Sequence, residues 1–174
     1  KMKDEPIRQI LQKTIEQVER VVGITQRLTN FSKPGVESEI PESVALNEVV
    51  DNLLSFVGHG LKVDNIKVEK EIDPKISIHA NRKQIEQILL NLIINASQAL
   101  EKRTGEIKIE ACEKNGSVKI LVRDTGSGIP ADKIDHIFEP FFTTKESGTG
   151  LGLYITKQLV ERNKGRISVE SQPG

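Results

Sequence analysis

Two asparagines in an apolar segment are the first residues whose type and spacing could do chemistry. Asn91 and Asn95 lie in NLIINA (91–96), and a spacing of four places both amides on one face of a helix. Burying an amide without a partner costs free energy, so both side chains need partners. They could hydrogen-bond the backbone of a neighbouring loop. Alternatively, their oxygens, which are hard ligands, could hold Mg²⁺ beside phosphate groups.

A carboxylate followed by two glycines is the second candidate. Asp124 comes directly after a segment of alternating apolar and polar residues, and Gly126 and Gly128 follow it. A carboxylate at the end of a strand offers a hydrogen-bond acceptor, and glycine lets the backbone approach a ligand closely. Asp-x-Gly is also typical of an ordinary turn, so this motif alone does not identify a binding loop.

A glycine-rich segment, GTGLGL (148–153), is the third candidate and stands immediately before a helical pattern. Its glycines free the backbone, and the start of a helix offers N–H groups and a positive dipole to phosphate. The glycines are not followed by the Lys-Ser/Thr of a P-loop, nor preceded by the strand of a Rossmann turn. By itself the segment fits a flexible hinge as well as a phosphate-binding loop.

A cluster of phenylalanines is the fourth candidate. Of the six aromatic residues, three lie between positions 138 and 142, in IFEPFFTTK (137–145). Aromatic rings in a polar segment need an apolar contact. They could belong to the core, or they could anchor the base of a mobile lid. In the second case Lys145 would be a cation able to reach phosphate.

The rest of the pattern predicts the elements that position these candidates. Asn47 and Asn81 are predicted helix caps, and Asn115-Gly116 is a strong hairpin signal. The apolar periodicity predicts helices at 47–57, 82–102, 131–136 and 151–163, and strands at 66–72, 75–80, 106–113, 117–124 and 166–171. The predicted fold class is therefore α+β.

A long amphipathic helix is predicted ahead of this domain, over residues 5–33, and Pro34-Gly35 ends it. Its apolar stripe needs a partner, either the following domain or another helix, in this chain or a second copy. The segment PGVESEIP (34–41) has the composition of a linker. A linker favours a helical bundle over packing against the domain.

Composition excludes several classes of protein. The 174 residues carry 25 basic and 25 acidic side chains and a single cysteine, Cys112. The lone cysteine excludes an internal disulfide framework, and the neutral charge argues against a nucleic-acid partner. No apolar run approaches the ~20 residues of a membrane span. We expect a cytoplasmic protein, attached to a membrane, if at all, through regions outside this chain.

In their order and spacing, the four candidate segments resemble the N, G1, F and G2 boxes of sensor histidine kinases. Those kinases belong to the GHKL, or Bergerat-type, ATPases, which include gyrase B. The resemblance covers about residues 41–174 and implies a Bergerat ATP-binding fold, which is a two-layer α/β sandwich, over 42–174. It also implies ATP and Mg²⁺ as cofactors. Because 166–171 has no strand after it to pair with, we expect that the last strand of this domain is missing.

Residues 1–33 resemble the second helix of the dimerisation and phosphotransfer hairpin of these kinases, with 34–41 as the linker. That resemblance implies a homodimer formed through the N-terminal helix. The family's acceptor histidine lies in a His-Glu/Asp-x-x-x-Pro context, which is absent here. None of His59, His79 and His136 fits it. The chain therefore resembles a kinase fragment that starts after its own phosphorylation site.

The resemblance also implies roles for individual residues. Asp124 would accept a hydrogen bond from the adenine amino group, and Gly126 and Gly128 would let backbone approach the base. Asn91 and Asn95 would hold Mg²⁺ on the triphosphate. Asn91 and Lys145 are the expected catalytic residues. The implied nucleotide-binding residues are Asn91, Asn95, Asp124, Gly126, Gly128, Ile129, Phe138, Thr144, Lys145, Gly148, Thr149, Gly150, Leu151 and Gly152.

The implied activity is transfer of the γ-phosphate of Mg–ATP to a histidine of the dimerisation domain. An aspartate of a response regulator would receive it next, in two-component signalling. Hydrolysing relatives usually carry Glu where this chain has Asn91, and an amide cannot take a proton at neutral pH. Two alternatives stay open: a serine kinase or ATPase of the same superfamily, and a nucleotide-binding regulatory module without autophosphorylation.

Overall fold

The computed structural model describes residues 40–63, 65–100, 104–145 and 148–173. The helix predicted at 5–33, and the dimer contact expected from it, lie outside the described residues. The elements in chain order are β1 (Glu42–Ala45), α2 (Leu46–Val63), β2 (Ile66–Ile72), β3 (Ser77–Ala80), α3 (Arg82–Ala99), β4 (Gly105–Lys114), β5 (Ser117–Asp124), α4 (Ala131–Ile134) and α5 (Gly152–Arg162).

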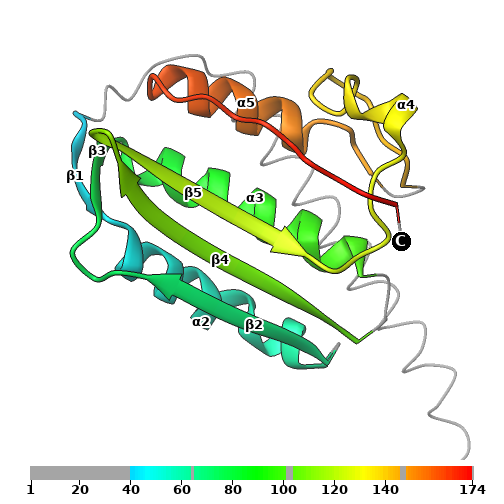
Figure 1. The fold of residues 1–174 in the computed structure, drawn as a ribbon, viewed down its shortest axis with the longest axis horizontal. Helices are drawn as coiled ribbons and strands as arrows, with labels where there is room; N and C mark the ends of the chain where they lie inside the picture. The colour runs from blue at the N-terminus through cyan, green and yellow to red at the C-terminus, as the bar shows by residue number, and fades with distance from the viewer. Residues whose placement is uncertain (1–39, 64, 101–103, 146–147, 174) are drawn as a thin grey trace, which may run out of the picture.

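Helices and strands form two layers (Figure 1). The main sheet has the order β2-β4-β5, with β2 parallel to β4 and β4 antiparallel to β5, while β1 and β3 form a separate antiparallel pair. Parallel neighbours need a crossover connection, and α3 provides the one between β2 and β4. The helices α2 and α3 cover one face of the sheet, and α5 packs against α3 beside the β5 edge. The predicted two-layer α/β sandwich is confirmed.

The predicted hairpin is found between β4 and β5. Asn115 and Gly116 both have positive φ, 54° and 71°, as a two-residue type I′ turn requires. The register pairs Lys114 with Ser117 at the turn and Ile107 with Asp124 at the opposite end. The turn thus fixes the register of β5 against β4. In this register Asp124 lies at the end of the sheet, beside the end of α3.

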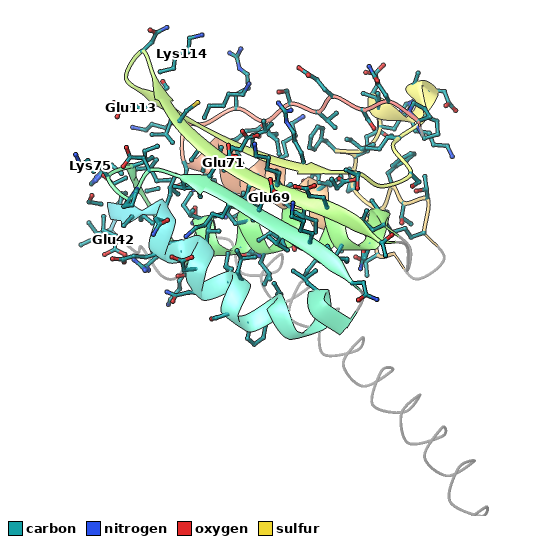
Figure 2. The ribbon with its side chains drawn as sticks, turned by 60° about the horizontal axis from the view of Figure 1, so that its bottom comes forward. Glu42, Glu69, Glu71, Lys75, Glu113 and Lys114 are labelled. Carbon is teal, nitrogen blue, oxygen red and sulfur yellow. The ribbon has the colours of Figure 1, made fainter. Side chains whose placement is uncertain are left out.

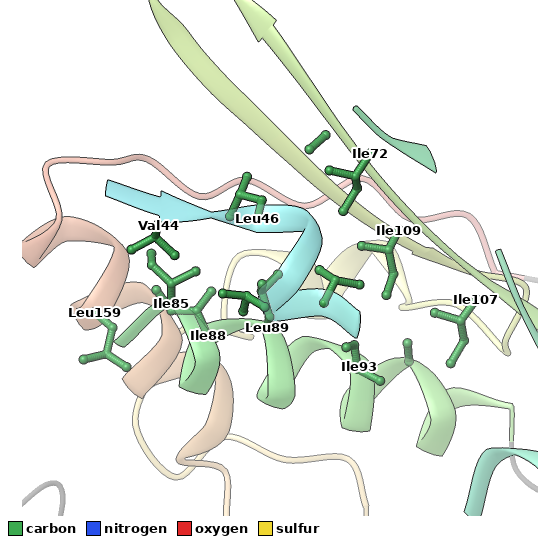
Figure 3. Close-up of a cluster of buried hydrophobic side chains, with 14 of the residues drawn as sticks. Val44, Leu46, Ile72, Ile85, Ile88, Leu89, Ile93, Ile107, Ile109 and Leu159 are labelled. Carbon is green, nitrogen blue, oxygen red and sulfur yellow. The ribbon is translucent and has the colours of Figure 1, made fainter. Parts of the chain in front are cut away.

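The core lies between α3 and the sheet (Figure 3). Ile107 and Ile109 of β4 are completely buried and face Leu89 and Ile93 of α3, which are 0% and 1% exposed. β1 and the start of α2 close the same core with Val44, Leu46, Val49 and Val50. Burial of this apolar surface holds α3 in place, and α3 carries the candidate asparagines.

The other face of the sheet is charged. Lys108 of β4 pairs with Glu71 of β2 at 2.9 Å and with Glu110 at 3.3 Å, and Lys67 pairs with Glu69 and Glu106. Glu69 and Glu71 both project from β2 (Figure 2). Alternation along β2 and β4 therefore separates an apolar face from a face of paired charges. Lys70 of β2 is an exception, because it lies on the apolar side and its ammonium group reaches Asn47 of α2.

Two predictions for the start of the domain are wrong. Asn47 is not a cap: α2 begins at Leu46, and the Asn47 amide oxygen accepts from Lys70 Nζ at 2.8 Å. The helix also continues to Val63 rather than ending at 57. β1 was not predicted, because four residues carry too little alternation to indicate a strand. Its pairing with β3 is a tertiary contact.

The strand predicted at 166–171 is also wrong, since the structure has no strand there. Alternating residues favour a strand, but a strand also needs a ladder of backbone hydrogen bonds. The segment instead runs back from the end of α5 to the loop after β5 (Figure 1), where the Ser171 hydroxyl accepts from Ile129 N at 2.8 Å. The remaining predicted helices and strands are present: β2 and β5 have the predicted ends, and the others differ by at most three residues.

Candidate functional site

The helix α3 is the support of the candidate site. Asn81 caps it as predicted, because its side-chain oxygen accepts from Gln84 N at 3.0 Å. The face of α3 toward the sheet is buried, whereas Asn91 and Asn95 are half-buried. The residues of α3 that contact the candidate loops extend from Asn91 to Ala99. Eight helical positions span roughly 12 Å.

The two asparagines face the start of α5. The Asn91 amide nitrogen lies 3.5 Å from Gly152 O and 3.4 Å from Thr156 Oγ1. One turn along α3, the Asn95 amide nitrogen is 3.9 Å from where a Cβ on Gly152 would lie. The NH₂ group of Asn91 therefore makes a hydrogen bond to neighbouring backbone, which is one of the two hypotheses from the sequence.

Thr156 was missed by the sequence analysis. It is completely buried, and its hydroxyl donates to Gly152 O at 2.9 Å. Its signal in the sequence was a polar residue on the apolar face of α5, between Ile155 and Leu159. Such a residue is consistent with ordinary helix packing, because threonine commonly bonds to the carbonyl four residues earlier.

Asp124 begins a loop that packs on the end of α3. Its Oδ1 accepts from Gly126 N at 2.9 Å, and Ser127 N donates to Ala99 O at 3.1 Å. Ala99 O is one of the last carbonyls of α3, which lack partners within the helix. A Cβ on Gly126 would lie 2.6 Å from Ala99 O, so this close approach requires glycine. The turn uses one oxygen of an exposed carboxylate.

The same loop is held on its far side by the C-terminal segment. Gly128 has φ +72°, and a Cβ there would lie 2.3 Å from Gln172 O. Ile129 N donates to the Ser171 hydroxyl. The loop is thus fixed between the end of α3 and residues 171–172. Ser171 and Gln172 are a second contribution that the sequence analysis missed, because only the fold brings them to Gly128.

The segment that carries Lys145 also contacts α3. Lys145 Nζ donates to Gln98 Oε1 at 2.8 Å, and Gly148 N donates to Lys145 O at 3.1 Å. A Cβ on Gly148 would lie 2.1 Å from Thr143 Oγ1. Thr144 is exposed. Lys145 is therefore placed about one helical turn from Asn95 along α3.

The glycines and phenylalanines meet where this segment joins α5. Gly150 has φ +67°, and a Cβ on it would lie 2.2 Å from the carbonyl carbon of Phe141. Phe141 itself has φ +66° and is 70% exposed. Thr149 Oγ1 lies 3.4 Å from the backbone N of the buried Leu151. Because Gly150 has no Cβ, its backbone can lie directly against the backbone of Phe141.

None of the three clustered phenylalanines belongs to the buried core. Phe138 is half-buried, with Lys157 Nζ 5.9 Å from its ring centre. The ring of Phe142 lies 5.9 Å from His136. A hydrogen bond from His136 Nδ1 to Glu139 at 2.9 Å, together with the carboxylate charge, raises the pKa of His136. Phe138 and Phe142 thus lie against polar side chains outside the core.

The structure thus gathers the segment ends on one side of α3: Gly152 near Asn91 and Asn95, Lys145 at Gln98, and Gly126 at Ala99. Among the described residues, no group of three His, Cys, Asp or Glu is placed to hold a metal ion. In the same part of the chain, no helix is both long and apolar enough to span a bilayer.

Comparison with protein families gives a match over residues 80–174 to the model described as histidine kinase-, DNA gyrase B- and HSP90-like ATPase. Signal transduction histidine-protein kinase AtoS of Escherichia coli K12 is 36% identical over 98% of this chain. Sensory histidine kinase/phosphatase NtrB of Rhizobium leguminosarum bv. phaseoli is 31% identical over 90% of it. The chain spans 28% and 44% of these two proteins.

Solved structures show the same fold. The catalytic domain of histidine kinase ThkA superimposes with a TM-score of 0.66 at 33% identity, covering 71% of this chain and 81% of that domain. ThkA in complex with the response regulator protein TrrA gives a TM-score of 0.73 at 27% identity, over 91% of this chain and 45% of that one.

Proposed function

Because this chain belongs to the family of histidine kinase-, DNA gyrase B- and HSP90-like ATPases, we propose that residues 42–174 bind Mg–ATP and donate its γ-phosphate to a histidine. The acceptor lies on a dimerisation domain of which residues 1–33 are the second helix, 34–41 being the linker. A response regulator then receives the phosphate on an aspartate. The dimer forms through the N-terminal helix.

One observation carries the proposal: α3 holds three separate candidate segments within about two helical turns. Gly126 and Ser127 meet its end at Ala99, Lys145 meets Gln98, and Gly152 meets Asn91 and Asn95. A nucleotide is long, with a neutral base at one end and charged phosphates at the other. A row of sites of different chemistry along one rigid helix suits such a ligand.

The donor set fits the ligand at both ends. At the base end, the exposed Asp124 carboxylate accepts hydrogen bonds, and Gly126 and Gly128 remove side chains from the loop beside it. Ile129 and Phe138 would add apolar surface for the base. For the phosphates the chain offers the Thr144 and Thr149 hydroxyls, the start of α5, where Leu151, at the N-cap position, makes no side-chain capping bond, and the Lys145 ammonium, which in this structure contacts Gln98 between the two ends of the site. Such a helix start binds anions.

The divalent cation fits the asparagine pair. Amide oxygens are hard ligands, and Mg²⁺ is commonly held by one or two protein groups together with substrate phosphates. Asn91 and Asn95 supply two such groups one turn apart. When bound, Mg²⁺ supplies charge neutralisation on the phosphates. No carboxylate stands beside Asn91 on α3 to act as a base, so these residues act by positioning and by charge.

The test is a titration of residues 1–174 with an ATP analogue in the presence of Mg²⁺. Asp124→Asn should weaken binding by more than about tenfold, because it replaces a charged acceptor of the adenine amino group with a weaker amide. The matched control is Asp132→Asn, another exposed aspartate, on α4, which should bind like the parent. Unchanged affinity in the Asp124 variant would contradict the adenine assignment.

A phosphotransfer assay separates the kinase from its alternatives. The chain is mixed with a protein that supplies the histidine-bearing helix, together with labelled ATP. Acid-labile, base-stable phosphate on that partner is expected for a histidine kinase. Acid-stable phosphate would indicate a serine kinase, release of inorganic phosphate an ATPase, and binding without any transfer a regulatory module.

A further inference from the structure

The buried hydroxyl of Thr156 has a second use that its helix packing does not explain. Threonine in a helix commonly bonds the carbonyl four residues earlier, and Thr156 does so at Gly152 O, 2.9 Å away. That bond uses the single hydroxyl hydrogen. The oxygen of Thr156 can then only accept, and its neighbour at 3.4 Å is the amide nitrogen of Asn91.

The orientation of the Asn91 amide follows from the chemistry of these neighbours. Gly152 O is a carbonyl and can only accept, and the Thr156 oxygen has no hydrogen left to donate. Both groups that α5 presents to Asn91 are therefore acceptors. An amide turned the other way would place its oxygen against two oxygens, which is electrostatically unfavourable. The NH₂ group must face α5, and the amide oxygen must point away from it.

We propose that Thr156 is a positioning residue for Mg²⁺ binding: it fixes the Asn91 amide so that the oxygen, and not the NH₂ group, is presented to the ion. This inference rests on the proposed function, in which Asn91 is a metal-holding residue. Groups that orient a metal ligand commonly change metal affinity by about 10–100-fold when they are removed. Thr156 itself touches neither nucleotide nor metal.

The matched variants are Thr156→Val and Thr156→Ser. Valine keeps the shape of threonine and loses the hydroxyl, whereas serine keeps the hydroxyl. The dissociation constant of an ATP analogue is measured for each chain in excess Mg²⁺ and in EDTA. Thr156→Val should lose about tenfold of the affinity gained from Mg²⁺, with affinity in EDTA unchanged. Thr156→Ser should keep the gain. Equal Mg²⁺ gains in the parent and Thr156→Val would overturn the inference.

A second measurement needs no ligand. Side-chain NH₂ resonances of Asn91, assigned by their loss in Asn91→Asp, should shift in Thr156→Val and stay near the parent position in Thr156→Ser. The NH₂ resonances of Asn95 serve as the internal control. Unshifted Asn91 resonances in Thr156→Val would overturn the inference, whether or not the parent chain binds nucleotide. Failure of the parent chain to bind nucleotide is a separate outcome, and it would refute the proposed function.

Circular dichroism and the midpoint of thermal unfolding show whether each variant is folded. If Thr156→Val does not fold, Thr156→Ala replaces it in both measurements. Alanine also removes the hydroxyl and is the best helix former. The same outcomes then apply: a reduced Mg²⁺ gain with shifted Asn91 resonances supports the inference, and parent-like values overturn it.

Discussion

Single atoms at the amide and carboxylate positions decide what chemistry this site can perform. Asn91 presents an amide, which cannot take up a proton at neutral pH, and its NH₂ group lies against Gly152 and Thr156. Asp124 keeps an exposed carboxylate in the loop that packs on the last residue of α3. In the proposed function, these side chains orient the ligand and balance its charge, and the nucleophile is a histidine outside the site.

His136 beside Glu139 gives a pH dependence at this scale. Their hydrogen bond and the carboxylate charge raise the pKa of His136 above its ordinary 6.5. The pair therefore contributes stability fully below the unfolded pKa and loses it as pH rises through the raised pKa of the folded protein. Glu139→Gln should lower the pKa of His136 toward 6.5, as measured by an NMR titration of the imidazole.

The control for this titration is Glu113→Gln, at the distant end of β4, which should leave the pKa of His136 unchanged. A His136 pKa that is the same in the parent and in Glu139→Gln would show that the contact with Glu139 does not form in solution. Because both side chains are exposed, high salt should reduce the difference between the two proteins.

At the scale of elements, α3 organises the site and the loops adapt to it. The helix is fixed by its cap at Asn81 and by its apolar face on the sheet, so its exposed end and outward face are rigid. Loops then approach its backbone and polar side chains closely, and glycine is used where a Cβ would collide. Gly126 against Ala99 is the closest example at the base end.

Gly126→Ala tests this arrangement. Its Cβ would lie 2.6 Å from Ala99 O, so the loop must move away and the bond from Ser127 N to Ala99 O must lengthen. We expect a loss of about 1–3 kcal/mol in the free energy of unfolding, measured by urea denaturation. Nucleotide affinity should fall as well, because the loop carries the segment next to Asp124.

The matched control is Gly58→Ala in α2, where nothing lies within 4 Å of the new Cβ. Alanine in a helix interior should raise the free energy of unfolding by about 0.5–1 kcal/mol. The two substitutions are chemically identical and should have opposite signs. A parent-like stability for Gly126→Ala would show that the loop does not pack on α3 in solution.

At the scale of the whole molecule, the two faces of the sheet have different tasks. The apolar face binds α2 and α3 into one layer, while the opposite face of β2 and β4 carries charges that largely neutralise one another. Exposed ion pairs of this kind contribute little to stability. The stability of the domain therefore depends on the core under α3, and the geometry of the site depends on it too.

Leu89→Ala measures that dependence. Leu89 is 0% exposed, and removing its side chain should cost about 2–5 kcal/mol in the free energy of unfolding. The control is Phe56→Ala on α2, where the ring is 80% exposed and the change should stay within about 0.5 kcal/mol. Similar losses for both variants, measured by denaturant unfolding, would contradict the assigned core.

The sequence by itself determined those elements that depend on local signals, and the chemistry they carry. Periodicity, the cap at Asn81 and the Asn115-Gly116 turn are local signals, because they depend on side chains a few residues apart. They predicted α3, the β4–β5 hairpin and the α+β fold class. Residue type and spacing also made the asparagine pair, the Asp124 loop and the glycine-rich segment separate candidates. The resemblance to sensor histidine kinases joined them into one site and predicted the two-layer sandwich.

Only the tertiary structure decided which residues meet. Three contacts join positions far apart in the chain: β1 with β3, Thr156 with Asn91, and Gln172 with Gly128. Residues 166–171 likewise alternate as a strand does, but the fold gives them no strand to pair with. The free energies of the three contacts depend on distances that the fold sets after the core has packed. No local pattern of residues encodes such distances. In the sequence Thr156 is therefore indistinguishable from any other threonine in a helix, because its contact with Asn91 exists only when α5 packs against α3.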